Sequence, residues 1–213
     1  MSERGSYAKG RERREAILKA TLDVFSQNEY RDVSLRAIAR ELNISPALLQ
    51  HYFPSREELL MEVVSAWDAE NHRLGDGMSP LGYWLAGIRH NAEIPGLVRL
   101  YTALAIEATD PGHAAWPYIK NRYDTLTAEI VKDVEAQKTA GSCDPDLDSE
   151  RVTRLLIAAC EGLQIRWLHS PEFDVYEDFV FLLKQLGITP PPEAKLLTAS
   201  LNVASHEGDK VRS

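Results

Sequence analysis

Apolar positions along this chain recur every three to four residues, which is the spacing of helices that bury one side. One such stripe, Ile17, Leu18, Leu22 and Phe25, predicts a helix from about Arg11 to Asn28. No Asn-Gly or Asp-Gly pair lies between two alternating runs, so the sequence carries little sign of hairpins. The pattern therefore predicts an all-α protein.

Turn and cap residues divide the rest of the chain into further helices. A second stripe begins at Leu35, and Ser45-Pro46 predicts the start of a third, short helix. The capping box at Ser55 opens a fourth helix that ends near Gly75. Ser79-Pro80 opens the next, Pro95-Gly96 interrupts it, and further helices are expected over 97–108, 114–139, 149–169 and 175–186.

Two breaks in this pattern suggest how the chain is divided. Gly75-Asp76-Gly77 reads as a linker between a head, residues 11–71, and a helical body, residues 78–187. Three prolines from position 190 end the helical pattern, and residues 188–213 are expected to form a mobile tail.

Charge is distributed unevenly between these parts. The chain has 213 residues and a net charge of −8, yet residues 1–56 hold ten Lys and Arg against seven Asp and Glu. That leaves +3 on the first quarter and −11 on the remainder, which suggests that only the first quarter meets phosphate. No apolar run approaches the length of a membrane span, and two cysteines do not make a disulfide scaffold. We therefore expect a cytoplasmic protein that has no membrane partner.

The segment from Ser34 to Phe53 has the pattern of a helix-turn-helix. Two short helices flank a tight turn at Asn43, a residue type that tolerates the left-handed conformation. Apolar residues on both sides of the turn, among them Ile38 and Leu49, can fix the angle between the helices. An ordinary helical corner would look similar, so this pattern alone leaves DNA binding as one of two readings.

The second of these helices has an unusual outward face. At about 100° per residue, Leu49 and Phe53 share one edge, and the opposite side carries neither Lys nor Glu. Gln50 can pair with adenine, and apolar Leu48 or Ala47 can meet a thymine methyl group. The remaining candidate contacts, to base edges or phosphates, are His51, Tyr52, Arg56 and Ser34.

Two runs resemble the reading head of TetR-type transcriptional regulators. They are REAILKATLDVF, from Arg14, and VSLRAIARELNISPALLQHYFPSREELL, from Val33 to Leu60. The resemblance covers roughly residues 11–70. It departs from the family pattern at Asn43, Leu48 and Gln50, where the family often has Gly, Thr and Tyr, so no operator sequence is predicted.

The resemblance implies an all-helical homodimer that binds a palindromic double-stranded DNA operator and usually represses transcription. It also implies that an unidentified small-molecule effector binds the body and releases the DNA. By position, the residues that match family DNA contacts are Ser34, Ser45, Pro46, Ala47, Leu48, Gln50, Tyr52 and Arg56; His51 is added from the helical wheel.

The body offers less specific candidates. Its last two helices are amphipathic, and in the family such a pair forms the dimer; intrachain core is an equally good reading of each residue. The candidate dimer residues are Leu155, Ala159, Leu163, Phe179 and Leu183. Aromatic and polar residues of the middle helices suggest an effector pocket, although aromatics at helical spacing more often form core. The candidates are Trp84, His90, Tyr101, Glu107, Trp116, Arg122, Tyr123 and Trp167.

Enzyme signatures are missing from the sequence. It contains no glycine-rich phosphate loop and no His-Glu-x-x-His run, and its six histidines are scattered singly. We therefore expect neither catalysis nor a cofactor or metal. Two functions remain open: a ligand-responsive DNA-binding repressor, or a helical small-molecule-binding or interaction protein with little DNA affinity.

Overall fold

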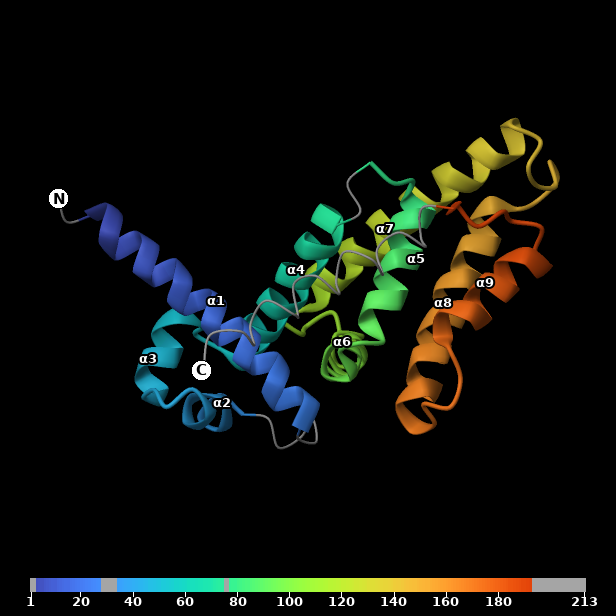
Figure 1. Ribbon diagram of the computed structural model, residues 1–213. Helices are drawn as coiled ribbons and strands as arrows, with labels where there is room; N and C mark the ends of the chain where they lie inside the picture. The colour runs from blue at the N-terminus through green and yellow to red at the C-terminus, as the bar shows by residue number, and fades with distance from the viewer. Residues whose placement is uncertain (1–2, 28–33, 75–76, 193–213) are drawn as a thin grey trace, which may run out of the picture. The chain divides into compact units, whose positions relative to one another are not determined.

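A computed structural model describes residues 3–27, 34–74 and 77–192 of the chain, and these residues form helices without any strand (Figure 1). The expected all-α class is confirmed. In chain order the helices are α1 Glu3–Gln27, α2 Leu35–Glu41, α3 Pro46–Tyr52, α4 Arg56–Leu74, α5 Pro80–Asn91, α6 Pro95–Glu107, α7 Trp116–Thr139, α8 Ser149–His169 and α9 Val175–Gln185.

Two compact units make up the chain, and each has its own core. The first unit combines residues 1–69 with residues 91–124, so α6 and the first part of α7 belong with the helices of the head. Here α1 packs against α2 and α6, and α2 packs against α3. Its core contains Ile17 of α1, Leu49 of α3, and the buried side of α4 at Leu59, Leu60 and Val63.

The second unit combines residues 70–90 with residues from 125 onward. Its helices α8 and α9 lie side by side (Figure 1). Buried side chains of α5, α7, α8 and α9 form its core, including Leu85, Val134, Leu156 and Phe179. None of the described helices combines the length and the apolar character that crossing a membrane requires.

The second unit continues past the boundary expected at residue 187. Ile188 is buried in its core, and the Thr189 backbone exchanges two hydrogen bonds with the Gln137 side chain, at 3.0 and 3.1 Å. These contacts attach residues 188 and 189 to α7. Most of the expected tail, and Gly75 and Asp76 of the expected linker, lie outside the described residues.

Candidate nucleic-acid interface

The turn between α2 and α3 has the geometry that its sequence predicts. Asn43 adopts a φ of 52°, in the left-handed region where Asn is tolerated better than most side chains. The Ile44 N–H donates to the Ala39 carbonyl at 2.9 Å, and the Asn43 N–H donates to the Arg40 carbonyl at 3.0 Å. These bonds close the C-terminal end of α2 and direct the chain into α3.

A serine caps the N-terminal end of three helices in this region. The Ser34 hydroxyl accepts a hydrogen bond from the Ala37 N–H at 3.2 Å, and Ser45 accepts one from the Leu48 N–H at 3.1 Å. Ser55 does the same for Glu58 at 3.1 Å, as its position in the capping box predicts. Because a hydroxyl can accept and donate at once, Ser34 and Ser45 each keep a hydroxyl proton that can still be donated to another group.

Helix α3 has one buried edge and one open face. Leu49 is fully buried and Phe53 is 1% exposed, as the helical wheel predicts. The opposite side is open to solvent, with Ala47, Leu48, Gln50 and His51 all exposed. Tyr52 is half-buried and packs against the core of the first unit. These four predicted contact residues of α3 therefore share an accessible face, and α3 itself has no acidic side chain.

Arg56, a predicted phosphate contact at the start of α4, already has carboxylates beside it. Its Nη1 atom lies 3.6 Å from Oε2 of Glu107 on α6 and 4.0 Å from Oε1 of Glu57. Glu107 is one of the residues predicted for an effector pocket, and nothing in the sequence spacing of Arg56 and Glu107 signals their pairing. A phosphate at Arg56 would share the guanidinium with Glu107.

Two of the predicted effector residues belong to a polar cluster in the first unit. Arg122 on α7 donates to Asp68 on α4 through Nε at 2.8 Å and Nη2 at 3.1 Å. Its guanidinium carbon lies 4.5 Å from the ring centre of Tyr101 on α6, and the Tyr118 hydroxyl donates to Asp68 at 3.3 Å. Asp68 and Tyr118 are not among the predicted residues, because pairs that lie 50 or more residues apart leave no periodic signal in the sequence.

Burial and neighbouring charges shift the pKa values of Tyr118 and Arg122 in this cluster. Burial, reinforced by the Asp68 carboxylate, raises the pKa of the Tyr118 hydroxyl well above its usual value. Burial works against the charged form of Arg122, but the hydrogen bond to Asp68 and the electrostatic attraction of Tyr101, Asp68 and Tyr118 together outweigh it, so the pKa of Arg122 is raised. Arg122 and Asp68 thus form a charged connection between α4 and α7.

The other predicted effector residues are divided between the two units. Trp116 and Tyr123 are half-buried in the first unit, where Tyr123 packs against the core. Trp84, His90 and Trp167 belong to the second unit. There the rings of Trp84 and Phe179 pack in a T-shaped arrangement with their centres 4.9 Å apart, and Nδ1 of buried His90 lies 3.0 Å from Oδ1 of Asn71. Trp167 packs against the same core.

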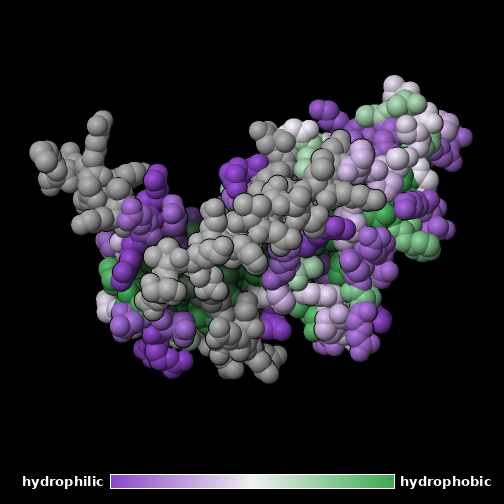
Figure 2. All heavy atoms as spheres, viewed as in Figure 1, coloured by the Kyte–Doolittle hydropathy of each residue, from purple (hydrophilic) through white to green (hydrophobic). Residues whose placement is uncertain are grey.

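The predicted dimer residues fall into two groups. Phe179 and Leu183 are fully buried in the core of their own chain, and Leu163 is half-buried against it. Ala159 is half-buried, whereas Leu155 is 57% exposed. Phe181 on α9, which is not among the predicted dimer residues, is 63% exposed. Figure 2 shows hydrophobic residues among hydrophilic ones on the visible surface at the right, where α8 and α9 lie.

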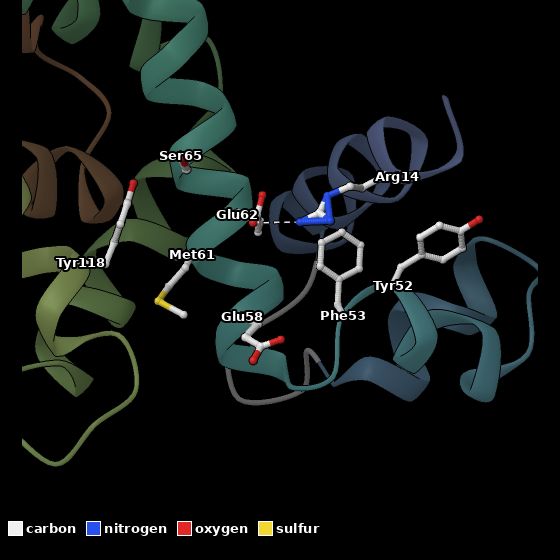
Figure 3. A pocket seen from close by; sticks show the side chains of 8 residues that line it. All are labelled: Arg14, Tyr52, Phe53, Glu58, Met61, Glu62, Ser65 and Tyr118. Carbon is white, nitrogen blue, oxygen red and sulfur yellow. Dashed lines mark ion pairs between the residues drawn. The ribbon is translucent and has the colours of Figure 1, made fainter. Parts of the chain in front are cut away.

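A hollow of about 300 Å³ lies in the first unit, along one side of α4 (Figure 3). None of the predicted effector residues lines it, and Tyr52 is the only predicted DNA contact that does. The lining residues are Arg14, Tyr52, Phe53, Glu58, Met61, Glu62, Ser65 and Tyr118.

Known proteins resemble the head and, more distantly, most of the chain. A family model described as bacterial regulatory proteins of the tetR family matches residues 17–63. The transcriptional regulator UidR of Escherichia coli K12 is 27% identical over 157 residues, which are 70% of this chain and 79% of UidR. The repressor KstR of Mycolicibacterium smegmatis is 44% identical over 73 residues, 34% of each chain.

The likeness in structure extends beyond the head. A TetR-family regulator from a Rhodococcus species superposes with a TM-score of 0.68 at 23% identity, over 83% of this chain and 99% of the other. The family match coincides with the described helix-turn-helix, and UidR and KstR are both helix-turn-helix regulators by name. The chain therefore carries a segment, residues 17–63, that matches the tetR family of bacterial regulatory proteins, and over 70% of its length it is similar to a helix-turn-helix transcriptional regulator.

Proposed function

We propose that this protein is a cytoplasmic repressor that binds a palindromic operator as a homodimer and leaves it when a small molecule binds. The observation that carries the proposal is the outward face of α3, where Leu48, Gln50 and His51 are exposed and no acidic side chain is present. A helix of this kind enters the major groove with its outward side chains on base edges. No catalytic step forms part of the proposal.

The side chains of this face divide into base contacts and phosphate contacts. Gln50 has the amide that can bond adenine N6 and N7 together, while Leu48 and Ala47 can contact a thymine methyl group. His51 could make either kind of contact, because its ring can donate to a base edge or to a phosphate. The phosphate contacts come from the rim of the motif, at Ser34, Ser45, Pro46, Tyr52 and Arg56.

A dimer requires an apolar surface that the chain leaves open, and α8 provides one. Leu155, Ala158, Gly162 and Ile165 follow each other at three- and four-residue spacing, and all four are exposed. Phe181 adds an exposed ring on α9. We assign these residues to the interface in preference to buried Phe179 and Leu183. Two heads about 34–36 Å apart could then reach successive major grooves on one side of the DNA.

We infer that helix α4 links the effector to the DNA, because only three residues separate it from α3 and its Asp68 side chain contacts Arg122 on α7. An effector that favours a different position of α4 would change the separation of the two heads. To release DNA it must bind the DNA-incompetent form more tightly. We propose that such an effector acts near the Asp68–Arg122 pair, from which Tyr101 and Tyr118 can contact an aromatic or polar ligand.

Salt dependence of DNA binding tests the proposal. The affinity of the full chain for the promoter regions of its own and neighbouring genes should fall steeply between two salt concentrations, because bound phosphates release counterions. Random DNA of equal length serves as the control and should bind more weakly. Absence of binding, or equal binding to both at each salt concentration, would favour a helical small-molecule-binding protein with little DNA affinity.

A further inference from the structure

One arginine side chain joins three helices at the point where α3 ends. Arg14 belongs to α1, and its Nη2 atom lies 2.8 Å from Oε1 of Glu62 on α4. Its guanidinium carbon lies 4.8 Å from the ring centre of Phe53, the residue that caps the C-terminal end of α3. Figure 3 shows the three side chains grouped at the hollow, with the ion pair drawn between Arg14 and Glu62.

Helix α3 needs support at this end. It has only seven residues, of which Leu49 alone is buried, and a helix that short is not stable by itself. Phe53 is 1% exposed and carries the chain out of α3 toward α4. A cation over the Phe53 ring, held there by a carboxylate on α4, therefore restrains the last turn of α3 against two longer helices.

We propose that Arg14 is a positioning residue for DNA recognition: it restrains the end of α3 through Phe53 and Glu62 and does not itself contact phosphate. The residues that it positions are Tyr52 and His51, immediately before Phe53. This inference rests on the DNA-binding function proposed above. Arg14 is therefore not one of the basic residues near the N-terminus that we expect to contact the phosphates of the DNA backbone.

Removal of the Glu62 carboxylate should change DNA affinity in opposite directions, depending on whether Arg14 binds phosphate or restrains α3. If Arg14 bound phosphate, Glu62 would compete for it, and removing the carboxylate would strengthen DNA binding. If Arg14 restrains α3, Glu62 holds the arginine in place, and its removal weakens binding. Both side chains are partly exposed, 38% for Arg14 and 45% for Glu62, so either can be replaced with little effect on the core.

The experiment measures the affinity of the full chain for the duplex that the wild-type protein selects from a random-sequence pool. We expect Arg14→Ala and Glu62→Ala each to weaken binding about fivefold, equivalent to about 1 kcal/mol. The double variant should bind no more weakly than either single variant, because both replacements break the same restraint. The slope of log affinity against log salt should stay at its wild-type value in all three.

Arg13→Ala is the matched control, since Arg13 is the exposed neighbour on the same helix and has the same charge. It should leave the protection of α3 amides against hydrogen exchange unchanged, while Glu62→Ala should reduce that protection. The exchanged pair Arg14→Glu/Glu62→Arg, which keeps the net charge, should recover part of the lost affinity. If a single variant proves unstable, the DNA affinity of this exchanged pair tests the proposal in its place.

Three results would overturn the proposal. They are tighter DNA binding by Glu62→Ala, a salt slope that falls by about one unit in Arg14→Ala, and equal exchange protection of α3 in Glu62→Ala and the wild type. If the wild-type protein selected no duplex at all, the proposed function would fail, and that outcome is distinct from these three.

Discussion

Helices α3 and α9 are both held in place by the rest of the chain, but through different kinds of contact. α9 buries five side chains, including Phe179 and Leu183, and so it is held by the core of the second unit. α3 buries Leu49 alone and depends on a serine cap, a left-handed turn and the Phe53 corner. A helix with so little buried surface can devote the rest of its surface to recognition. Its position then depends on contacts at its ends.

The largest expected effect concerns the buried side of α9. Phe179→Ala should lower the free energy of unfolding by about 3–5 kcal/mol, because it removes a fully buried ring that also meets Trp84. Urea unfolding of the two proteins measures the difference. A loss below about 1 kcal/mol would mean that α9 is not anchored through this residue.

Phe181 is the matched control on the opposite side of the same helix. Phe181→Ser should leave the unfolding of the single chain nearly unchanged, since the ring is 63% exposed. It should instead weaken self-association by about 2 kcal/mol, as loss of an aromatic interface anchor does. Sedimentation at several concentrations measures this effect. Unchanged association would place the interface elsewhere.

On α3, Gln50→Ala should cost about 1–3 kcal/mol of discrimination at one base pair of the operator. Affinities for the selected duplex and for single-base variants of it measure this effect. Binding to random DNA should hardly change, because Gln50 is assigned to a base and not to a phosphate. Equal losses on specific and random DNA would remove Gln50 from base readout.

The smallest expected effect concerns the cap of α3. Ser45→Ala removes the hydroxyl that accepts the Leu48 N–H, and should lower the free energy of unfolding by about 1 kcal/mol. Ser65→Ala is the control, since Ser65 is exposed in the middle of α4 and should change stability little. If both variants unfolded alike, the Ser45 cap would contribute nothing to stability.

Local structure was largely predictable from the sequence. Ser45-Pro46, Asn43 and the Ser55 capping box predicted the start of α3, its preceding turn and the start of α4, because each signal acts over a few residues. The start of α1 was less predictable. Its apolar stripe begins at Ile17, but the helix begins at Glu3, since extending a helix that has already formed does not require an apolar stripe.

Contacts between distant helices could not be predicted. No spacing rule joins Arg14 to Glu62, Asp68 to Arg122 or Arg56 to Glu107, since each pair depends on how whole helices pack. The buried side of α9 was also ambiguous. Phe179 and Phe181 lie two residues apart on nearly opposite sides of an apolar helix, and only packing decides which ring enters the core.

The most direct test of DNA recognition by α3 is a crystal structure of the full chain bound to its selected duplex. We expect α3 to lie in the major groove, with the Gln50 amide within hydrogen-bonding distance of a base edge and Leu49 still buried. A complex in which another surface contacts the DNA, with Gln50 and His51 open to solvent, would contradict this account.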